Sequence, residues 1–297
     1  MPMRFTPTYC PNCGEKLDAI APKCEHCGTP NRDPKIVKQY GHHFVLSPLR
    51  QVFMFLVGFL GLQIIGFLVE LVLELIGIGQ YPAGSEMTLA DFITKFFKQP
   101  WVLLTTNGFT YLIIIGFIFL ILRKDVKRLG KEFNNWVPYV AGVAGFAVLF
   151  IVDLLWGQAS RAIIAANGIT PQSNQNQTTI VALVRASPFV SLLIFGLMGP
   201  FAEEMTYRVG LFGFASRFGK VAGYIVTALI FGFIHFGWSA IFTPAYPGQL
   251  IVELANIPSY IFAGVIFCFL YDRYGFGASL TAHLINNVVS ILLSLIP

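Results

Sequence analysis

The chain has 297 residues, of which 55% are hydrophobic and only 12% charged, and its formal net charge is +5. Soluble domains carry about 25% charged residues, so this composition excludes an ordinary soluble globular protein and indicates a membrane protein. The positive charge comes without a dense patch of basic and aromatic residues, so no nucleic-acid partner is expected.

Two cysteine pairs, CPNCG and CEHCG, lie within residues 1–30. Each C-x2-C pair places two thiolates on one tight turn, and the glycine that follows permits the unusual backbone angles of such a turn. Four thiolates are typical of a closed structural zinc site. Free thiols or disulfides are the alternatives, and a cytoplasmic location disfavours disulfides. The pattern predicts a small zinc ribbon followed by a linker (residues 31–51), with zinc ligands Cys10, Cys13, Cys24 and Cys27.

Apolar segments long enough to cross a bilayer follow this linker. A span needs about 20 predominantly apolar residues. Five segments have this length: Val52–Gly79, Trp101–Leu122, Trp136–Gly157, Leu250–Tyr271 and Phe276–Pro297. Two shorter runs reach it only with the polar residues that follow them: Pro188–Ala202 and Val221–Phe236. The predicted fold is an all-α polytopic membrane protein of about seven to eight transmembrane helices, with an eighth near Thr178–Ser187 or Ser239–Gln249.

The basic residues predict the orientation of the chain. The first fifty residues lack the apolar stretch of a signal peptide, so the N-terminus is expected in the cytoplasm. With that start, 16 Lys and Arg residues fall in inside segments and 4 in outside loops. This asymmetry fits the positive-inside rule. We therefore expect an integral protein of the cell membrane with a cytoplasmic N-terminus.

Few ionisable residues interrupt the apolar segments. A charge at mid-bilayer costs roughly 2.5–3.5 kcal/mol, so such residues are candidates for function. Three helices carry candidate groups: Glu203, Glu204 and Arg208; His235; and His283 with Asn287. Each group alone also has a structural explanation, as a solvated helix end, a core histidine or a hydrogen bond between helices. Glu253, near the start of another span, has no assigned role.

Spacing predicts different tasks for the two adjacent glutamates. Glu204 and Arg208 are four residues apart, so on a helix they face each other as an internal ion pair. Glu203 points about 100° away around the helix, which leaves its carboxylate available for chemistry. His283 and Asn287 also share a helix face. If the three helices are neighbours, these faces converge on one buried pocket.

In chain order, EEMTYR (Glu203–Arg208), FGFIH (Phe231–His235) and HLINN (His283–Asn287) resemble the three motifs of the CPBP intramembrane protease family. Those motifs are E-E-x-x-x-R, F-x-x-x-H and H-x-x-x-N/D, and all three are present without departure. The family includes CAAX prenyl endopeptidases and bacteriocin-processing or immunity relatives. The resemblance covers residues 136–297, leaves residues 52–135 as N-terminal transmembrane helices, and does not extend to the zinc ribbon.

The resemblance implies a glutamate-dependent endopeptidase buried in the membrane, with no catalytic metal. Glu203 and His235 would activate a water, with Glu203 as the general base. His283 and Asn287 would stabilise the oxyanion, and the Glu204–Arg208 pair would orient the site. The implied partners are the lipid bilayer and a membrane-associated peptide or protein substrate. Because the ribbon resembles those of bacterial membrane proteins, a prenylated substrate is not expected.

Two other functions use the same residues. A zinc-dependent intramembrane metalloprotease would take Glu203, His235 and His283 as ligands, although no H-E-x-x-H motif is present. A non-enzymatic membrane scaffold or transporter-like protein, for example in bacteriocin self-immunity, would use buried polar residues along an ion or proton path. The polar faces gather on three helices rather than along a path, which favours the protease.

Overall fold

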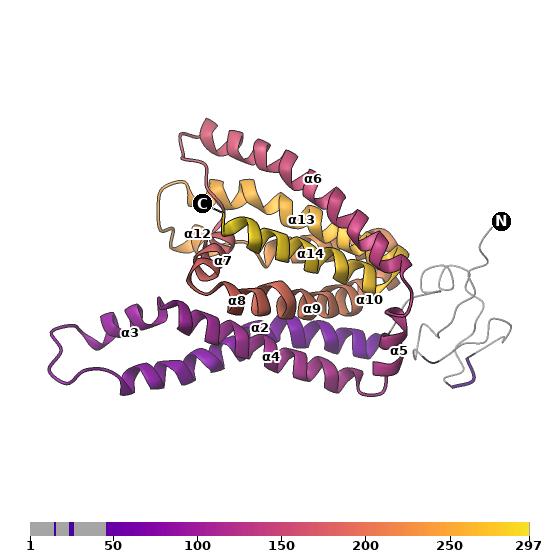
Figure 1. The fold of residues 1–297 in the computed structure, drawn as a ribbon, viewed down its shortest axis with the longest axis horizontal. Helices are drawn as coiled ribbons and strands as arrows, with labels where there is room; N and C mark the ends of the chain where they lie inside the picture. Colours follow the sequence, from indigo (N-terminus) through magenta and orange to yellow (C-terminus); the bar gives the residue numbers. More distant parts are fainter. Residues whose placement is uncertain (1–14, 16–23, 27–45, 297) are drawn as a thin grey trace.

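The computed structural model describes residues 15, 24–26 and 46–296, and the regular structure of these residues is helical (Figure 1). Most of the expected zinc ribbon and most of the expected linker lie outside the described residues. The long helices are α2 (Pro48–Gly79), α4 (Pro100–Leu122), α6 (Val137–Ala166), α11 (Lys220–Phe233), α13 (Gln249–Tyr274) and α14 (Phe276–Ser294). Shorter helices connect them: α3 (Leu89–Phe97), α5 (Val126–Glu132), α7 (Gln175–Ala186) and α12 (Ser239–Phe242).

Six helices of the described part of the chain are long and apolar enough to cross a membrane. They are α2, α4, α6, the continuous helix Pro188–Phe218, α13 and α14. Seven to eight were expected. The difference arises because α11 ends after 14 residues, and because the segments considered for an eighth span form the 12-residue α7 and the 4-residue α12.

Helix α2 shows why these helices fit a membrane. It begins at Pro48, inside the segment expected to be a linker. Its residues Ile64, Phe67 and Leu75 are 57%, 63% and 64% exposed, whereas Met54 is fully buried. A helix that exposes so many large apolar side chains fits hydrocarbon and not water. The chain is therefore an integral membrane protein.

The helix Pro188–Phe218 changes its winding along its length. It runs through α8 (Pro188–Ser191), η1 (Leu192–Met198), α9 (Gly199–Glu204), η2 (Met205–Phe212), α10 (Gly213–Ala215) and η3 (Ser216–Phe218). Both η1 and η2 are π-helical. π-Helical turns are rare and frequently occur at functional sites. Glu203 and Glu204 are the last two residues of α9, where the winding changes.

This interrupted helix lies in the middle of the bundle (Figure 1). Helices α13 and α14 pack on one side, α2 and α4 on the other, and α6 packs against α13 and α14. The approach of α2 depends on glycine: a Cβ at Gly210 would lie 2.7 Å from the backbone N of Phe55, and one at Gly58 would overlap the side chain of Thr206. The central position leaves Arg208 completely buried.

Candidate active site

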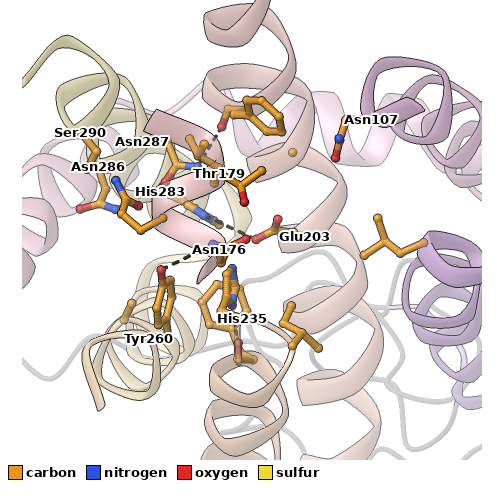
Figure 2. A pocket seen from close by; sticks show the side chains of 18 of the residues that line it. Asn107, Asn176, Thr179, Glu203, His235, Tyr260, His283, Asn286, Asn287 and Ser290 are labelled. Carbon is orange, nitrogen blue, oxygen red and sulfur yellow. Dashed lines mark hydrogen bonds and ion pairs between the residues drawn. The ribbon is translucent and has the colours of Figure 1, made fainter. Parts of the chain in front are cut away.

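A cavity of about 290 Å³ lies beside the interrupted helix, between α2, α4, α7, α11, α13 and α14 (Figure 2). Four of the six residues predicted to be catalytic line it: Glu203, His235, His283 and Asn287. The polar side chains of the three motifs therefore meet in one place, which was expected only if their helices are neighbours. The remaining two, Glu204 and Arg208, are fully buried behind the cavity wall.

Glu204 and Arg208 form the predicted ion pair. Nε of Arg208 lies 3.3 Å from Oε2 of Glu204, and both side chains are completely buried. The guanidinium also lies over the rings of Phe231 and Phe267, 4.4 Å and 5.1 Å from their centroids. Such cation–π contacts favour a desolvated cation. Among the described residues, Glu204 is the carboxylate that balances this charge.

Glu204 has two further partners, both on α14. The Ser279 hydroxyl donates to Oε2 at 2.5 Å, and Nδ1 of His283 lies 2.8 Å from Oε1. Because an ionised carboxylate only accepts, this contact places the proton of a neutral His283 ring on Nδ1. Nε2 then faces Glu203, whose Oε2 is 3.7 Å away. His283 thus lies between the two glutamates and is hydrogen-bonded to Glu204.

Glu203 is more loosely held than its neighbour. Its Oε1 accepts a long hydrogen bond of 3.3 Å from the hydroxyl of Tyr111 on α4. Its side chain is 12% exposed and points into the cavity (Figure 2). A general base must reach the proton that it abstracts, and this carboxylate has acceptor capacity left for a water molecule.

His235 follows the C-terminal end of α11 and also points into the cavity (Figure 2). Its Nδ1 lies 2.7 Å from the carbonyl oxygen of Phe231. A carbonyl can only accept, so the proton of the neutral ring lies on Nδ1 and the lone pair on Nε2. The ring stacks on Tyr260, with centroids 4.4 Å apart and an interplanar angle of 11°. His235 is therefore fixed as a hydrogen-bond acceptor toward the cavity.

Asn287 contacts the π-helical part of the interrupted helix. Its Nδ2 donates to the carbonyl oxygen of Phe195 at 2.9 Å, and its Oδ1 accepts from Asn286 at 3.4 Å. The amide has two N–H groups, so one remains for the cavity. Asn287 therefore joins α14 to η1 and also presents a donor.

Three side chains at this site were missed in the sequence: Tyr111, Tyr207 and Ser279. Tyr207 lines the cavity, and its buried hydroxyl has no hydrogen-bond partner among the described residues. Spacing could have found two of them, because Glu203–Tyr207 and Ser279–His283 are pairs four residues apart. Nothing in the sequence links Tyr111 to the site, since 92 residues separate it from Glu203.

The rest of the polar lining is uncharged. It includes Asn107, Asn176, Thr179, Asn286 and Ser290 (Figure 2). Amide and hydroxyl groups both donate and accept hydrogen bonds. This wall can bind water and the polar backbone of a peptide within an otherwise apolar bundle.

The predicted zinc ligands lie mostly outside the described residues. Cys10, Cys13 and Cys27 are not among them, and Cys24 is buried. Within residues 15, 24–26 and 46–296, no three His, Cys, Asp or Glu side chains are arranged to hold a metal ion. The zinc ribbon stays a prediction.

Comparison with known proteins identifies a family domain in the same region. Residues 185–289 match the family described as Rce1-like, Type II CAAX prenyl endopeptidase. This part of the chain is therefore similar to an Rce1-like domain. The matched region contains all six residues that were predicted to be catalytic, from Glu203 to Asn287.

The region that matches the Rce1-like family covers just over a third of the chain. A curated relative, the UPF0177 protein YvdC of Lactococcus lactis subsp. lactis (strain IL1403), is 24% identical over 187 residues. This alignment covers 63% of the chain and 64% of the relative, so the chain spans less than two thirds of that protein's length. No solved structure matches the chain.

Proposed function

We propose that this protein is an intramembrane endopeptidase that hydrolyses peptide bonds of membrane-associated peptides or proteins, with Glu203 as the general base. The observation that carries the proposal is the loosely held Glu203 carboxylate, which faces a polar cavity together with His235 and His283. The Rce1-like domain supports the same class of reaction.

In the proposed reaction, a water molecule binds between Glu203 and His235. Nε2 of His235 accepts a hydrogen bond from one O–H of the water. Glu203 accepts the other and takes its proton while the water oxygen attacks the carbonyl carbon of the scissile bond. When the tetrahedral intermediate collapses, the C–N bond breaks and Glu203 returns the proton to the leaving amine.

Donors around the cavity would stabilise the oxyanion of that intermediate. Asn287 has one N–H left, and the buried hydroxyl of Tyr207 has no partner among the described residues. His283 would donate from Nε2 only with a proton on both ring nitrogens, and the neutral ring described above would first have to gain one. In a serine protease, loss of one such donor lowers kcat by about 10²–10³. The Glu204–Arg208 pair would hold His283 in this orientation.

The substitution Glu203→Gln tests the proposal directly. We expect one or more membrane peptides to accumulate uncut in cells that carry this variant and not in wild-type cells, which would identify the substrate. Glu70→Gln is the matched control, because Glu70 is exposed on α2, away from the cavity. An unchanged membrane peptidome with Glu203→Gln would refute the peptidase function.

Chelators separate this mechanism from a zinc metalloprotease with Glu203, His235 and His283 as ligands. The test uses a variant with Cys10→Ser and Cys13→Ser, so that loss of zinc from the ribbon does not affect the result. We expect EDTA and phenanthroline to leave its activity unchanged. Inhibition by chelators that is reversed by added zinc would favour the metalloprotease.

We also propose that the N-terminal cysteines hold a structural zinc ion on the cytoplasmic side, where reducing conditions keep thiolates available as ligands. The purified chain should contain one zinc per protein, and the Cys10→Ser, Cys13→Ser variant should contain none. Equal zinc content in both proteins would contradict this site.

A further inference from the structure

Glu253 on α13 is a buried carboxylate that the proposed reaction does not use. It is 1% exposed and does not line the cavity. Its Oε1 accepts from the backbone N–H of Gln175 at 2.7 Å, and its Oε2 accepts from the N–H of Gly237 at 2.8 Å. Burying an ionised group costs free energy unless it is hydrogen-bonded. These two hydrogen bonds offset the cost of burying the Glu253 carboxylate.

The two N–H groups belong to segments that build the site. Gln175 is the first residue of α7, whose residues Asn176 and Thr179 form part of the cavity wall. The N-terminus of a helix favours a negative charge. Gly237 lies two residues after His235. One carboxylate on α13 therefore connects the wall helix to the segment that carries His235.

Asn174 connects the same elements through its uncharged side chain. Its Nδ2 donates to the carbonyl oxygen of His235 at 2.9 Å. Its Oδ1 accepts from the N–H of Gln177 at 3.1 Å and from the hydroxyl of Tyr260 at 3.2 Å. Tyr260 stacks on the His235 ring, and Figure 2 shows both side chains at the cavity. His235 is thus held through its backbone and its ring by groups of α7 and α13.

We propose that Glu253 is a positioning residue, which fixes His235 relative to α7 by binding the backbone of both segments. Gly237 suits this arrangement, because a Cβ there would lie 2.8 Å from Oε1 of Glu253 and would displace the carboxylate. The consequence for catalysis rests on the proposed peptidase function, whereas the positioning itself does not. The two are therefore tested separately.

Hydrogen–deuterium exchange of the full chain in lipid nanodiscs tests the positioning. In Glu253→Gln, the amides of Gln175 and Gly237 should exchange about tenfold faster or more, because they lose hydrogen bonds to a charged acceptor. Gly237→Ala should give the same local change, and Glu70→Gln should give none. Unchanged exchange at both amides would overturn the proposal. So would an equal rise throughout α4 and α14, which marks general loss of the fold.

Cleavage kinetics test the consequence, with the peptide that accumulates in Glu203→Gln cells as an internally quenched probe. Misplacing His235 should lower kcat by about 10- to 100-fold in Glu253→Gln while KM changes by less than about twofold. Glu253→Asp, which keeps the carboxylate, should recover part of the lost kcat. Full kcat in Glu253→Gln would overturn the role. If the wild-type chain cleaves nothing, the peptidase function fails and the exchange experiment still decides the positioning.

Discussion

Replacing each adjacent glutamate by glutamine tests the different environments that the structure gives them. Glu204 is completely buried and has one cation and two hydrogen-bond donors within 3.3 Å. Glu203 is partly exposed, and its contacts are longer: 3.3 Å to the hydroxyl of Tyr111 and 3.7 Å to Nε2 of His283. Both substitutions keep the size of the side chain and remove one negative charge.

The expected losses of stability differ severalfold. In Glu204→Gln the Arg208 guanidinium stays buried without a carboxylate, and breaking a buried ion pair in this way costs about 3–5 kcal/mol. In Glu203→Gln one long hydrogen bond is weakened, which costs about 1 kcal/mol or less. Both variants should lose peptidase activity, but only Glu204→Gln should also lose much of its stability.

Unfolding in detergent micelles by titration with SDS measures the two free energies under the same conditions. The midpoint for Glu203→Gln should lie close to that of the wild type and of Glu70→Gln, and the midpoint for Glu204→Gln should be clearly lower. Equal midpoints for the two glutamate variants would refute the distinction between a buried structural carboxylate and a free one. A midpoint for Glu203→Gln below that for Glu204→Gln would refute it as well.

Three further substitutions test contacts around the site. Tyr207→Phe should lower kcat by about 100-fold and leave the unfolding midpoint unchanged, because the hydroxyl has no partner in the described structure; an unchanged kcat would exclude it as an oxyanion donor. Ser279→Ala removes a hydrogen bond to a buried carboxylate and should destabilise the protein by about 1.5–3 kcal/mol in the same titration. Gly210→Ala should cost about 1–3 kcal/mol because the new methyl meets the backbone of Phe55, whereas Gly116→Ala, with open space around it, should not destabilise the protein; equal effects would contradict the close approach of α2.

The parts of the site that could be predicted are those that depend on helix geometry alone. Glu204 and Arg208 are one turn apart, so their ion pair requires only that the segment be helical. Whether His235 and His283 approach Glu203 depends on how α11, α13 and α14 pack, and spacing within one helix carries no information on this. The expectation that these residues share one site came from the resemblance of the three motifs, in chain order, to those of the CPBP family.

The features that the sequence did not predict also have physical causes. Tyr111 reaches Glu203 only because α4 packs beside the interrupted helix. The run Val221–Phe236 was counted as a span from its hydropathy, and hydropathy takes no account of hydrogen bonds. The structure bends the chain after Phe233, where Asn174 and Glu253 bind the backbone around His235. This polar network lies where α11 ends and holds the segment that carries His235 at the cavity.

Three polar residues spaced along α14 contribute both to helix packing and to the proposed chemistry. Ser279, His283 and Asn287 recur every four residues on one face; the first two bind Glu204, and the third binds the carbonyl of Phe195. A shift of one residue would rotate this face by about 100° and break all three contacts. Substitutions along it therefore change folding and chemistry together. Glu203 lies outside these hydrogen bonds, so loss of chemistry can be measured there without loss of the fold.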